Sequence, residues 1–348
     1  MLSWAGCVGT RHPWDDTDRG GATLAVSLSE NPKRDTPASG LRPGRLLVTG
    51  ANGHLGQRLL RRLAARGAQN LEVRAIVRSE RAAGVLRDLG LEPAPECVVV
   101  DYTDAAGLAQ AAEGCTHFVH LVGILKEDAT TRYTDAHEST CFALARAAEQ
   151  VGARRIVYLS ILGAAPNSGN PCLASKGRAE QILLERPVPT TVLRLPMVLG
   201  PGDIASRALR GKALAGLLPL VRGGRTLEQP IDADDVSQAI LLALSRGDLP
   251  AGVLELAGPE CLSHRALVMR AARLHRRQPR VVPLPLAFAR AFAWLAERTL
   301  ASPPLTRAML DVLEHDDRID PGPACRALGL TLTPLDETLR RCVGPEAA

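Results

Sequence analysis

The sequence feature that most constrains the fold is a glycine-rich turn, TGANGHLG, at residues 49–56. It follows a short apolar run, RLLVTG, and precedes GQRLLRRLAARG, where apolar residues recur at helical spacing. A strand, a glycine turn and a helix in this order are typical of the start of a nucleotide-binding βαβ unit. Gly50 permits the tight turn, Gly53 lets the backbone approach a pyrophosphate, and Gly56 lets the helix pack against the strand.

Beyond this turn, apolar strands alternate with amphipathic helices up to about residue 200. We expect strands at 45–50, 71–79, 96–104, 116–123, 153–163 and 190–200, and helices at 56–67, 105–113, 135–151 and 176–186. The strands are continuous apolar runs, which is typical of parallel strands covered by helices on both faces. The sequence therefore predicts an α/β fold with a doubly wound parallel Rossmann sheet.

After residue 200 the pattern becomes looser. Two basic stretches, 207–216 and 221–230, are expected to form a loop before a helix that starts near 232 and is capped by Asp234 or Asp235. A further strand at 253–258 is expected to return to the core sheet, and an apolar helix is expected at about 286–300.

These patterns divide the chain into three parts. We expect a disordered leader at 1–43, a Rossmann core at 44–200 and a smaller, mostly helical C-terminal subdomain at 201–345 that contacts a substrate or partner.

Composition excludes several classes of protein. With 46% hydrophobic and 23% charged residues among 348, the chain is not mainly disordered, and no apolar run reaches the roughly 18 residues of a membrane span. The net charge of +5 is spread along the chain and only 3% of residues are aromatic, so we expect no nucleic-acid binding. The eight cysteines form no Cys-x-x-Cys pair, so we expect neither a disulfide framework nor a metal site. A reducing cytoplasm fits this usage best.

The residue after the second strand bears on which nucleotide binds. NAD sites usually place an acidic residue there, whereas this chain has Arg78, whose guanidinium suits a 2′-phosphate and can stack on adenine. NADP(H) is therefore favoured, although the nearby Glu80 leaves NAD(H) possible. Asp101, at the end of the third strand, could accept a hydrogen bond from the adenine amino group or serve as a turn residue.

Eight motifs then occur in one order: TGANGHLG, the VR after the second strand, VDYTD, HLVG, RRIVYLSILGA, the SK of LASKGRAE, RLPMVLGPG and IDADDVSQAI. Together they resemble the extended and atypical short-chain dehydrogenases/reductases over residues 45–260. VVPLPLAFARAFAWLAE, PPLTRAMLDVLEHDD and ALGLTLTPLDETL resemble the bacterial relatives of the 39-kDa NAD(P)H-binding accessory subunit of respiratory complex I. In the mitochondrial relatives this resemblance implies a tightly held NADPH with a structural role.

The resemblance also implies which residues contact the dinucleotide. They are Gly50, Asn52, Gly53, His54, Leu55, Gly56, Arg78, Asp101, Tyr102, Leu121, Val122, Gly123, Lys176, Leu195, Pro196 and Val198. The last three, with Met197, would wall the nicotinamide end, and packing in the core is compatible with that role.

One motif departs from the family pattern. Catalytic members carry Tyr-x-x-x-Lys, in which the lysine lowers the pKa of the tyrosine and holds the nicotinamide ribose while the tyrosine relays a proton. Here Lys176 is present and Ser160 lies at a plausible spacing, but Cys172 stands where the tyrosine belongs. Tyr102, Tyr133 and Tyr158 do not fit that position. We expect Lys176 to remain a ribose ligand; the alternative is a catalytic role for Lys176 and Ser160, with the Cys172 thiol titrating near the lysine.

These observations lead to three functional hypotheses. The first is an NADP(H)-binding protein with weak or no classical dehydrogenase activity and a structural, assembly or redox-sensing role linked to respiratory-chain or quinone metabolism. The second is an active NAD(P)-dependent reductase, epimerase or isomerase with another proton relay, and the third is a sensor that reports the NADP⁺/NADPH ratio to a partner.

The apolar helix at 286–300 bears on partners. Phe288, Phe292, Trp294 and Leu295 lie on more than one of its faces, so we expect burial against the sheet, with a partner or membrane-surface contact as the alternative. In the alternative, Arg290, Glu297 and Arg298 lie at the polar boundary. The partners would be respiratory-chain or quinone-biosynthesis proteins, and the protein would be cytoplasmic or peripheral at the inner face of the membrane.

Overall fold

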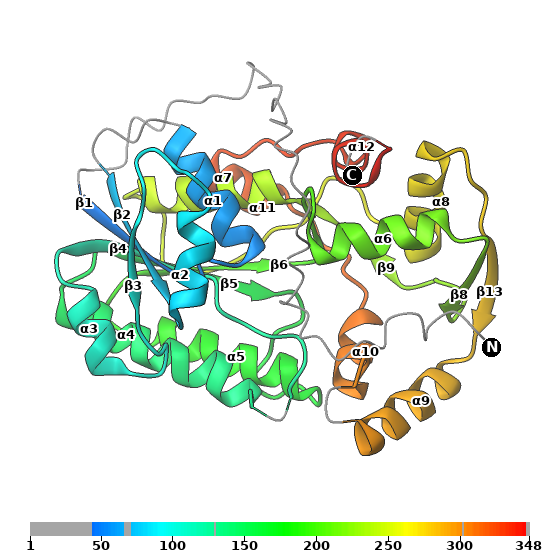
Figure 1. Cartoon of the computed structure of the whole chain (residues 1–348), viewed down its shortest axis with the longest axis horizontal. Helices are drawn as coiled ribbons and strands as arrows, with labels where there is room; N and C mark the ends of the chain where they lie inside the picture. The colour runs from blue at the N-terminus through cyan, green and yellow to red at the C-terminus, as the bar shows by residue number, and fades with distance from the viewer. Residues whose placement is uncertain (1–43, 66–70, 129, 301–302, 346–348) are drawn as a thin grey trace. The chain divides into compact units, whose positions relative to one another are not determined.

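The structure, a computed structural model, describes residues 44–65, 71–128, 130–300 and 303–345 (Figure 1). The leader expected at 1–43 and the glycine expected to end the first helix, Gly67, lie outside the described residues.

A seven-stranded parallel sheet forms the core, in the order β11-β6-β5-β4-β1-β2-β3. Its strands are β1 (Gly44–Thr49), β2 (Leu71–Val77), β3 (Glu96–Val99), β4 (Cys115–His120), β5 (Arg155–Ile161), β6 (Thr190–Leu195) and β11 (Gly252–Glu255). The strand order reverses between β1 and β4, and ligands of such sheets bind at the carboxyl ends of the strands at this point. The predicted doubly wound Rossmann sheet is confirmed.

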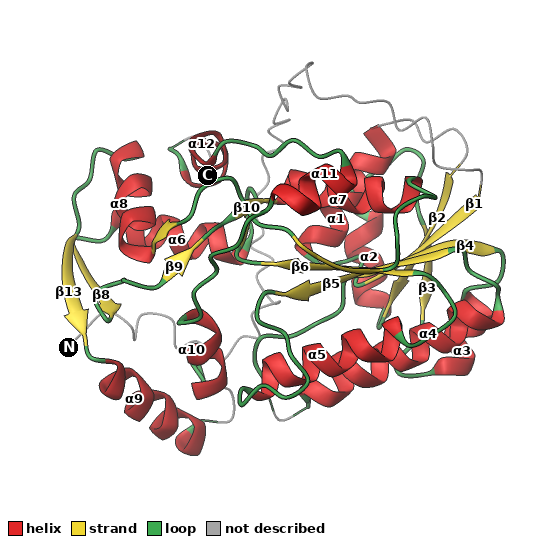
Figure 2. Cartoon of the chain, turned by 180° about the vertical axis from the view of Figure 1, so that it is seen from behind, coloured by secondary structure: helices red, strands yellow, loops and turns green. Residues whose placement is uncertain are grey.

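Helices cover both faces of the sheet (Figure 2). One face is covered by α1 (His54–Ala65), α2 (Glu80–Arg87), α7 (Ala233–Ser245) and α11 (Gly322–Leu328), the other by α3 (Ala105–Ala111), α4 (Thr140–Gln150) and α5 (Pro171–Leu184). Alternate strand residues enter the two cores: Leu46 and Val48 face the first set, and Leu47 faces the second. This double coverage explains why the strands are continuous apolar runs.

The remaining elements lie mostly after residue 197. They are β7 (Val198–Leu199), α6 (Ile204–Leu214), β8 (Leu217–Val221), β9 (Leu227–Glu228), β10 (Ile231–Asp232), β12 (Leu262–Ser263), α8 (His264–Leu274), β13 (Arg280–Leu284), α9 (Leu286–Thr299), α10 (Arg307–Leu313) and α12 (Leu335–Val343). Six of the strands form the pairs β10-β7, β12-β9 and β13-β8. A separate apolar cluster joins α6, α8 and α12 around Leu209, Leu267 and Leu339.

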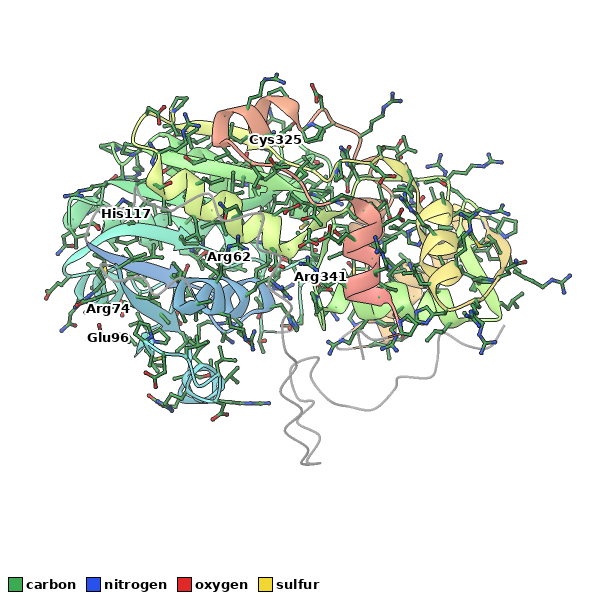
Figure 3. The ribbon with its side chains drawn as sticks, turned by 90° about the horizontal axis from the view of Figure 1, so that it is seen from above. Arg62, Arg74, Glu96, His117, Cys325 and Arg341 are labelled. Carbon is green, nitrogen blue, oxygen red and sulfur yellow. The ribbon has the colours of Figure 1, made fainter. Side chains whose placement is uncertain are left out.

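A cluster of charges at the start of α7 ties this part to the Rossmann core. Arg58 of α1 pairs with Asp234 at 2.8 Å, and Arg341 of α12 pairs with both Asp232 and Asp234. Figure 3 shows Arg341 and Arg62 on the helices beside this cluster, and Arg62 donates to Gln238 of α7 at 2.8 Å.

Several local predictions are corrected. Residues 204–214 form a helix instead of the expected basic loop, and Asp232, not Asp234 or Asp235, caps α7, because its side chain accepts from the Asp234 N–H at 2.8 Å. The helix that carries Lys176 begins at Pro171, five residues earlier than expected, with Asn170 as its cap. The short α2 was not expected, and a π-helical turn, η1 (Thr134–Ser139), precedes α4.

The expected burial of the α9 side chains is also wrong. Phe288 is 68% exposed, Leu295 53%, Phe292 49% and Trp294 41%, whereas α9 buries only its small alanines. Within the described ranges, no helix has both the length and the apolar character needed to cross a membrane.

Candidate functional site

The glycine turn lies at the carboxyl end of β1, at the point where the strand order reverses. Gly50 has a φ of +71°, which favours glycine. A Cβ on Gly56 would lie 2.5 Å from the Ala51 carbonyl oxygen and 2.6 Å from that of Gly50, so only glycine fits there. The first N–H groups of α1, which begins at His54, have no partners within the helix and can bind phosphate oxygens. We call residues 49–56, with the side chains packed beside them, the glycine-turn end.

Tyr102 holds this turn through hydrogen bonds. Its hydroxyl accepts a hydrogen bond from the Gly50 N–H at 3.1 Å and donates to the Ile76 carbonyl at 3.0 Å. The Arg78 guanidinium lies over the Tyr102 ring at 5.7 Å. Tyr102 is buried, so it holds the glycine turn in place, while Arg78 is exposed at the end of β2.

Two acidic residues near Arg78 already have partners. The Asp101 carboxylate accepts from the Thr103 N–H and hydroxyl, both at 2.8 Å, and these bonds lower the pKa of Asp101. This is the geometry of a turn residue, the alternative role considered for Asp101. Glu80 pairs with Arg87 at 3.4 Å on the exposed face of α2.

Lys176 lies at the carboxyl ends of β4 and β5. Its ammonium donates to the Tyr158 hydroxyl at 3.0 Å and to the Leu159 carbonyl at 3.2 Å. Complete burial lowers the pKa of Lys176. A Cβ on Gly123 would lie 2.7 Å from the Lys176 Nζ, so the segment after β4 passes directly over the ammonium group. We call Lys176, with the side chains around it, the lysine end.

Cys172 lies one helical turn before Lys176, but its thiol is already engaged. It donates to the Ile124 carbonyl at 3.7 Å, and it is in hydrogen-bonding contact with the Tyr133 hydroxyl. Tyr133 in turn donates to the Leu125 carbonyl at 2.9 Å. Burial raises the pKa of Cys172 to about 11, so the thiol remains protonated near neutral pH. No sequence pattern indicates that Tyr133 reaches this thiol.

Two buried polar atoms at the lysine end have no hydrogen-bond partner among the described residues. They are the Ser160 hydroxyl, at the end of β5, and Nδ1 of His137, on the π-helical turn. His137 is neutral, because burial lowers its pKa to about 2. Unpartnered polar groups in such a place are expected when a polar ligand completes the site. Together with the glycine turn, they fit a dinucleotide along this edge of the sheet.

The other expected contact residues lie along the same edge. Leu121, Val122 and Gly123 follow β4, Leu195 ends β6, and Pro196 and Val198 lie just beyond it. Leu195 is buried in the core, and Pro196, Met197 and Val198 are half-buried. This burial agrees both with packing in the core and with lining the nicotinamide end of a bound dinucleotide. Asn52, His54 and Leu55 belong to the glycine turn and the start of α1.

Residues after α9 also reach the lysine end. The Lys126 ammonium donates to the Pro303 carbonyl at 2.9 Å, and the Asn170 side chain donates to the Ala308 carbonyl at 2.8 Å. Beyond α10, His315 lies against Gly163 in the turn after β5, and its Nδ1 is 3.2 Å from the Asp317 carboxylate. No local pattern in the sequence links His315 to β5.

A parallel sheet with a glycine turn at its switch point and open polar groups at the neighbouring strand ends defines a dinucleotide-binding protein of Rossmann type. Residues 50–244 match a family described as NAD(P)H-binding, and the chain belongs to that family.

Known relatives include both respiratory-chain subunits and enzymes. The chain is 31% identical over 253 residues to the mitochondrial NADH dehydrogenase [ubiquinone] 1 alpha subcomplex subunit 9 of Arabidopsis thaliana, which covers 71% of this chain and 61% of that protein. It is 28% identical over 245 residues to a ceramide reductase of Caulobacter vibrioides, with 70% and 74% coverage.

Among solved structures, the fold is similar to that of UDP-glucuronic acid 4-epimerase from Bacillus cereus in complex with UDP-glucuronic acid and NAD. The TM-score is 0.67 at 18% identity, with 86% of this chain and 98% of that chain covered. At this identity the likeness shows the fold alone.

Proposed function

We propose that the protein binds NADP(H) and has a structural, assembly or redox-sensing role linked to respiratory-chain or quinone metabolism. The observation that carries this proposal is the state of the lysine end. The position of the usual tyrosine holds a buried, protonated Cys172 thiol engaged with Ile124, and Lys176 donates to Tyr158 inside the core. The phenol that tyrosine-based dehydrogenase chemistry requires is therefore absent from position 172.

The glycine-turn end would hold the pyrophosphate. Gly50, Gly53 and Gly56 leave room for its close approach, and the N-terminus of α1 would supply N–H groups. At the lysine end, Ser160 and Lys176 would contact the nicotinamide ribose and ring. The bound dinucleotide would supply or accept a hydride.

Arg78 supports the preference for NADP(H) over NAD(H). Its guanidinium is exposed beside the turn, whereas Asp101 accepts two hydrogen bonds within its own turn and Glu80 pairs with Arg87 on the exposed face of α2. A 2′-phosphate would give Arg78 a doubly charged partner.

The partner would meet the C-terminal helices. The exposed aromatic face of α9, with Arg298 lying over the Trp294 ring at 4.2 Å, offers an apolar surface with a charged boundary. The likeness to a respiratory-chain subunit supports a protein partner of that class, and a peripheral position at the inner face of the membrane would suit the same surface.

A second candidate function is an NAD(P)H-dependent reductase with a different proton donor. The unpartnered Ser160 hydroxyl at the end of β5 favours it, because catalytic members of the resembled family place a Ser or Thr near the reacting carbonyl. The likeness to a ceramide reductase agrees with this candidate.

The proposed function is tested by titrating NADPH and NADH against wild type, Arg78→Ala and Arg186→Ala. Arg186 is the matched control because it also lies over an aromatic ring, that of Phe142, but just beyond the end of α5. We expect wild type and Arg186→Ala to bind NADPH at least about 10-fold more tightly than NADH, and Arg78→Ala to lose that preference. Equal affinity of wild type for both nucleotides would contradict the NADP(H) preference.

A further inference from the structure

A histidine–aspartate pair from the C-terminal part of the chain reaches the end of β5. A Cβ on Gly163 would lie 2.7 Å from Nε2 of His315 and 3.1 Å from the two neighbouring ring carbons. The Nε2 edge of the imidazole therefore lies directly against this turn. Gly163 is two residues beyond the end of β5, three after the unpartnered Ser160 hydroxyl.

Asp317 fixes the orientation of the His315 ring. Its carboxylate lies 3.2 Å from Nδ1, and its own backbone N–H donates to the Leu227 carbonyl at 2.9 Å, which anchors it on β9. A carboxylate partner places a proton on Nδ1, and Nε2 lies at the turn around Gly163. In the described part of the chain Nε2 has no hydrogen-bond partner, and the side chain is 38% exposed, so it can exchange protons with solvent.

The charges around His315 favour its protonated form. The hydrogen bond that the His315 imidazole donates to the Asp317 carboxylate raises the pKa of His315, and Asp316 adds to that effect. Glu228 of β9 faces Asp317, and Glu314 precedes the histidine. The facing loop at 161–169 carries no charged residue that would oppose this effect.

Two histidines and two tyrosines of the lysine end are poor proton donors. Burial lowers the pKa of His120 to about 3 and that of His137 to about 2, so both are neutral. Burial raises the pKa of Tyr133, whose proton is donated to a backbone carbonyl, and Tyr158 is completely buried.

We infer that His315, oriented by Asp317, is the proton donor of this site for a carbonyl compound reduced by the bound dinucleotide. The inference rests on the dinucleotide binding of the proposed function and goes beyond it in assigning a reaction. The carbonyl carbon gains a hydride from the reduced nicotinamide, and the π electrons move to oxygen. The oxygen then takes the proton from Nε2. The products are an alcohol, the oxidised nicotinamide and a neutral imidazole, which regains a proton from water.

The test compares wild type with His315→Asn, which keeps an amide near the Nδ1 position but removes Nε2. The matched control is His275→Asn, since His275 is also half-buried and its Nε2 only contacts the Val343 carbonyl at 2.7 Å. NADPH oxidation is followed with 9,10-phenanthrenequinone as the carbonyl probe, and NADPH affinity is measured on the same samples. We expect His315→Asn to lower kcat at least about 100-fold with unchanged NADPH affinity, and His275→Asn to behave as wild type.

The pH profile separates proton donation from a structural role. Since a general acid acts in its protonated form, kcat should be high at low pH and fall as pH rises through the raised pKa of His315. Asp317→Asn removes the partner that raises this pKa, so the fall should move to lower pH. An NMR titration of the imidazole in the dinucleotide-free protein gives the same comparison without turnover.

Three results would overturn the inference. The first is a His315→Asn kcat within twofold of wild type, and the second is a His315 pKa at or below 6.5 in wild type. The third is wild-type protein that binds NADPH but does not reduce the probe, which would leave the proposed dinucleotide binding intact. Failure of wild type to bind NADPH would instead overturn the proposed function itself.

Discussion

The two ends of the candidate site differ in what builds them. The glycine-turn end is made of backbone: the positive φ of Gly50, the close approach at Gly56 and the N-terminus of α1. The lysine end is made of side chains: the Cys172 thiol donates a hydrogen bond to the Ile124 carbonyl, and the Lys176 ammonium donates one to the Tyr158 hydroxyl. The glycine-turn end therefore depends on residues that are neighbours in the sequence, whereas the lysine end depends on contacts between segments that are far apart in the sequence.

The largest effect is expected at Gly56. Gly56→Ala would place a methyl group 2.5 Å from the Ala51 carbonyl oxygen, which is backbone and cannot move away cheaply. We expect the free energy of unfolding to fall by about 3 kcal/mol and NADPH affinity to fall at least about 100-fold. Chemical denaturation and fluorescence titration measure the two effects.

The control for this variant is Gly84→Ala on α2, where a Cβ meets nothing within 4 Å. It should stabilise the protein by about 0.5–1 kcal/mol, because alanine favours the helix. If Gly56→Ala and Gly84→Ala had similar stability and NADPH affinity, the turn would not require the close approach of Gly56 to the Ala51 carbonyl.

A second prediction concerns the position of the missing tyrosine. Cys172→Tyr should destabilise the protein by about 1–3 kcal/mol, because Tyr133 and Ile124 already fill the space in front of the thiol. Adding Tyr133→Ala should recover most of that loss, and the double variant should reduce a carbonyl probe faster than Cys172→Tyr alone. Thermal unfolding of both variants checks this, and an unchanged melting temperature for Cys172→Tyr alone would mean that the space is open.

A third prediction returns to the glycine-turn end. Tyr102→Phe removes the acceptor of the Gly50 N–H and the donor to Ile76, so we expect a loss of about 1–2 kcal/mol in stability and a several-fold loss in NADPH affinity. Isothermal titration of the variant measures the affinity. Unchanged affinity would mean that the turn keeps its shape without the phenol.

The smallest effect is a pH dependence from Lys176. Its pKa is lowered in the folded protein, so below that lowered value the buried charge destabilises the fold fully. Between the lowered pKa and about 10.5 the unfolded state binds more protons, so stability should rise with pH. Lys176→Met should therefore be more stable than wild type by about 1 kcal/mol at neutral pH, with the difference shrinking as pH rises. A difference that grows with pH would contradict the lowered pKa.

The sequence predicts the glycine-turn end better than the lysine end. The strands and the glycine turn at 49–56 are encoded locally, by apolar runs and by glycine spacing, and they were predicted at their observed places. The expected strands at 96–104 and 190–200 are too long, because β3 ends at Val99 and β6 at Leu195. Helix α6 was taken as a loop because Gly211 and three basic residues obscure its apolar positions. The burial of α9 was misjudged because the pattern of a helix shows that it has an apolar face, but not whether another element covers it.

The lysine end depends on contacts between distant segments. Cys172 could be recognised from its place before Lys176, but its engagement with Tyr133 and Ile124 depends on how η1 and the segment after β4 fold together. The approach of His315 to Gly163 depends on the whole path of the C-terminal part, for which no local spacing exists.

The most direct test of the central claim is the nucleotide content of the protein itself. The protein is purified without added nucleotide and denatured, and the released compounds are identified and counted against chain concentration. We expect the released compound to be NADP(H), with NAD(H) as a minor component, and we expect the protein to bind NADPH again after the nucleotide is removed. If no dinucleotide is released, and neither NADPH nor NADH binds at millimolar concentration, the glycine turn does not serve a cofactor and the account is wrong.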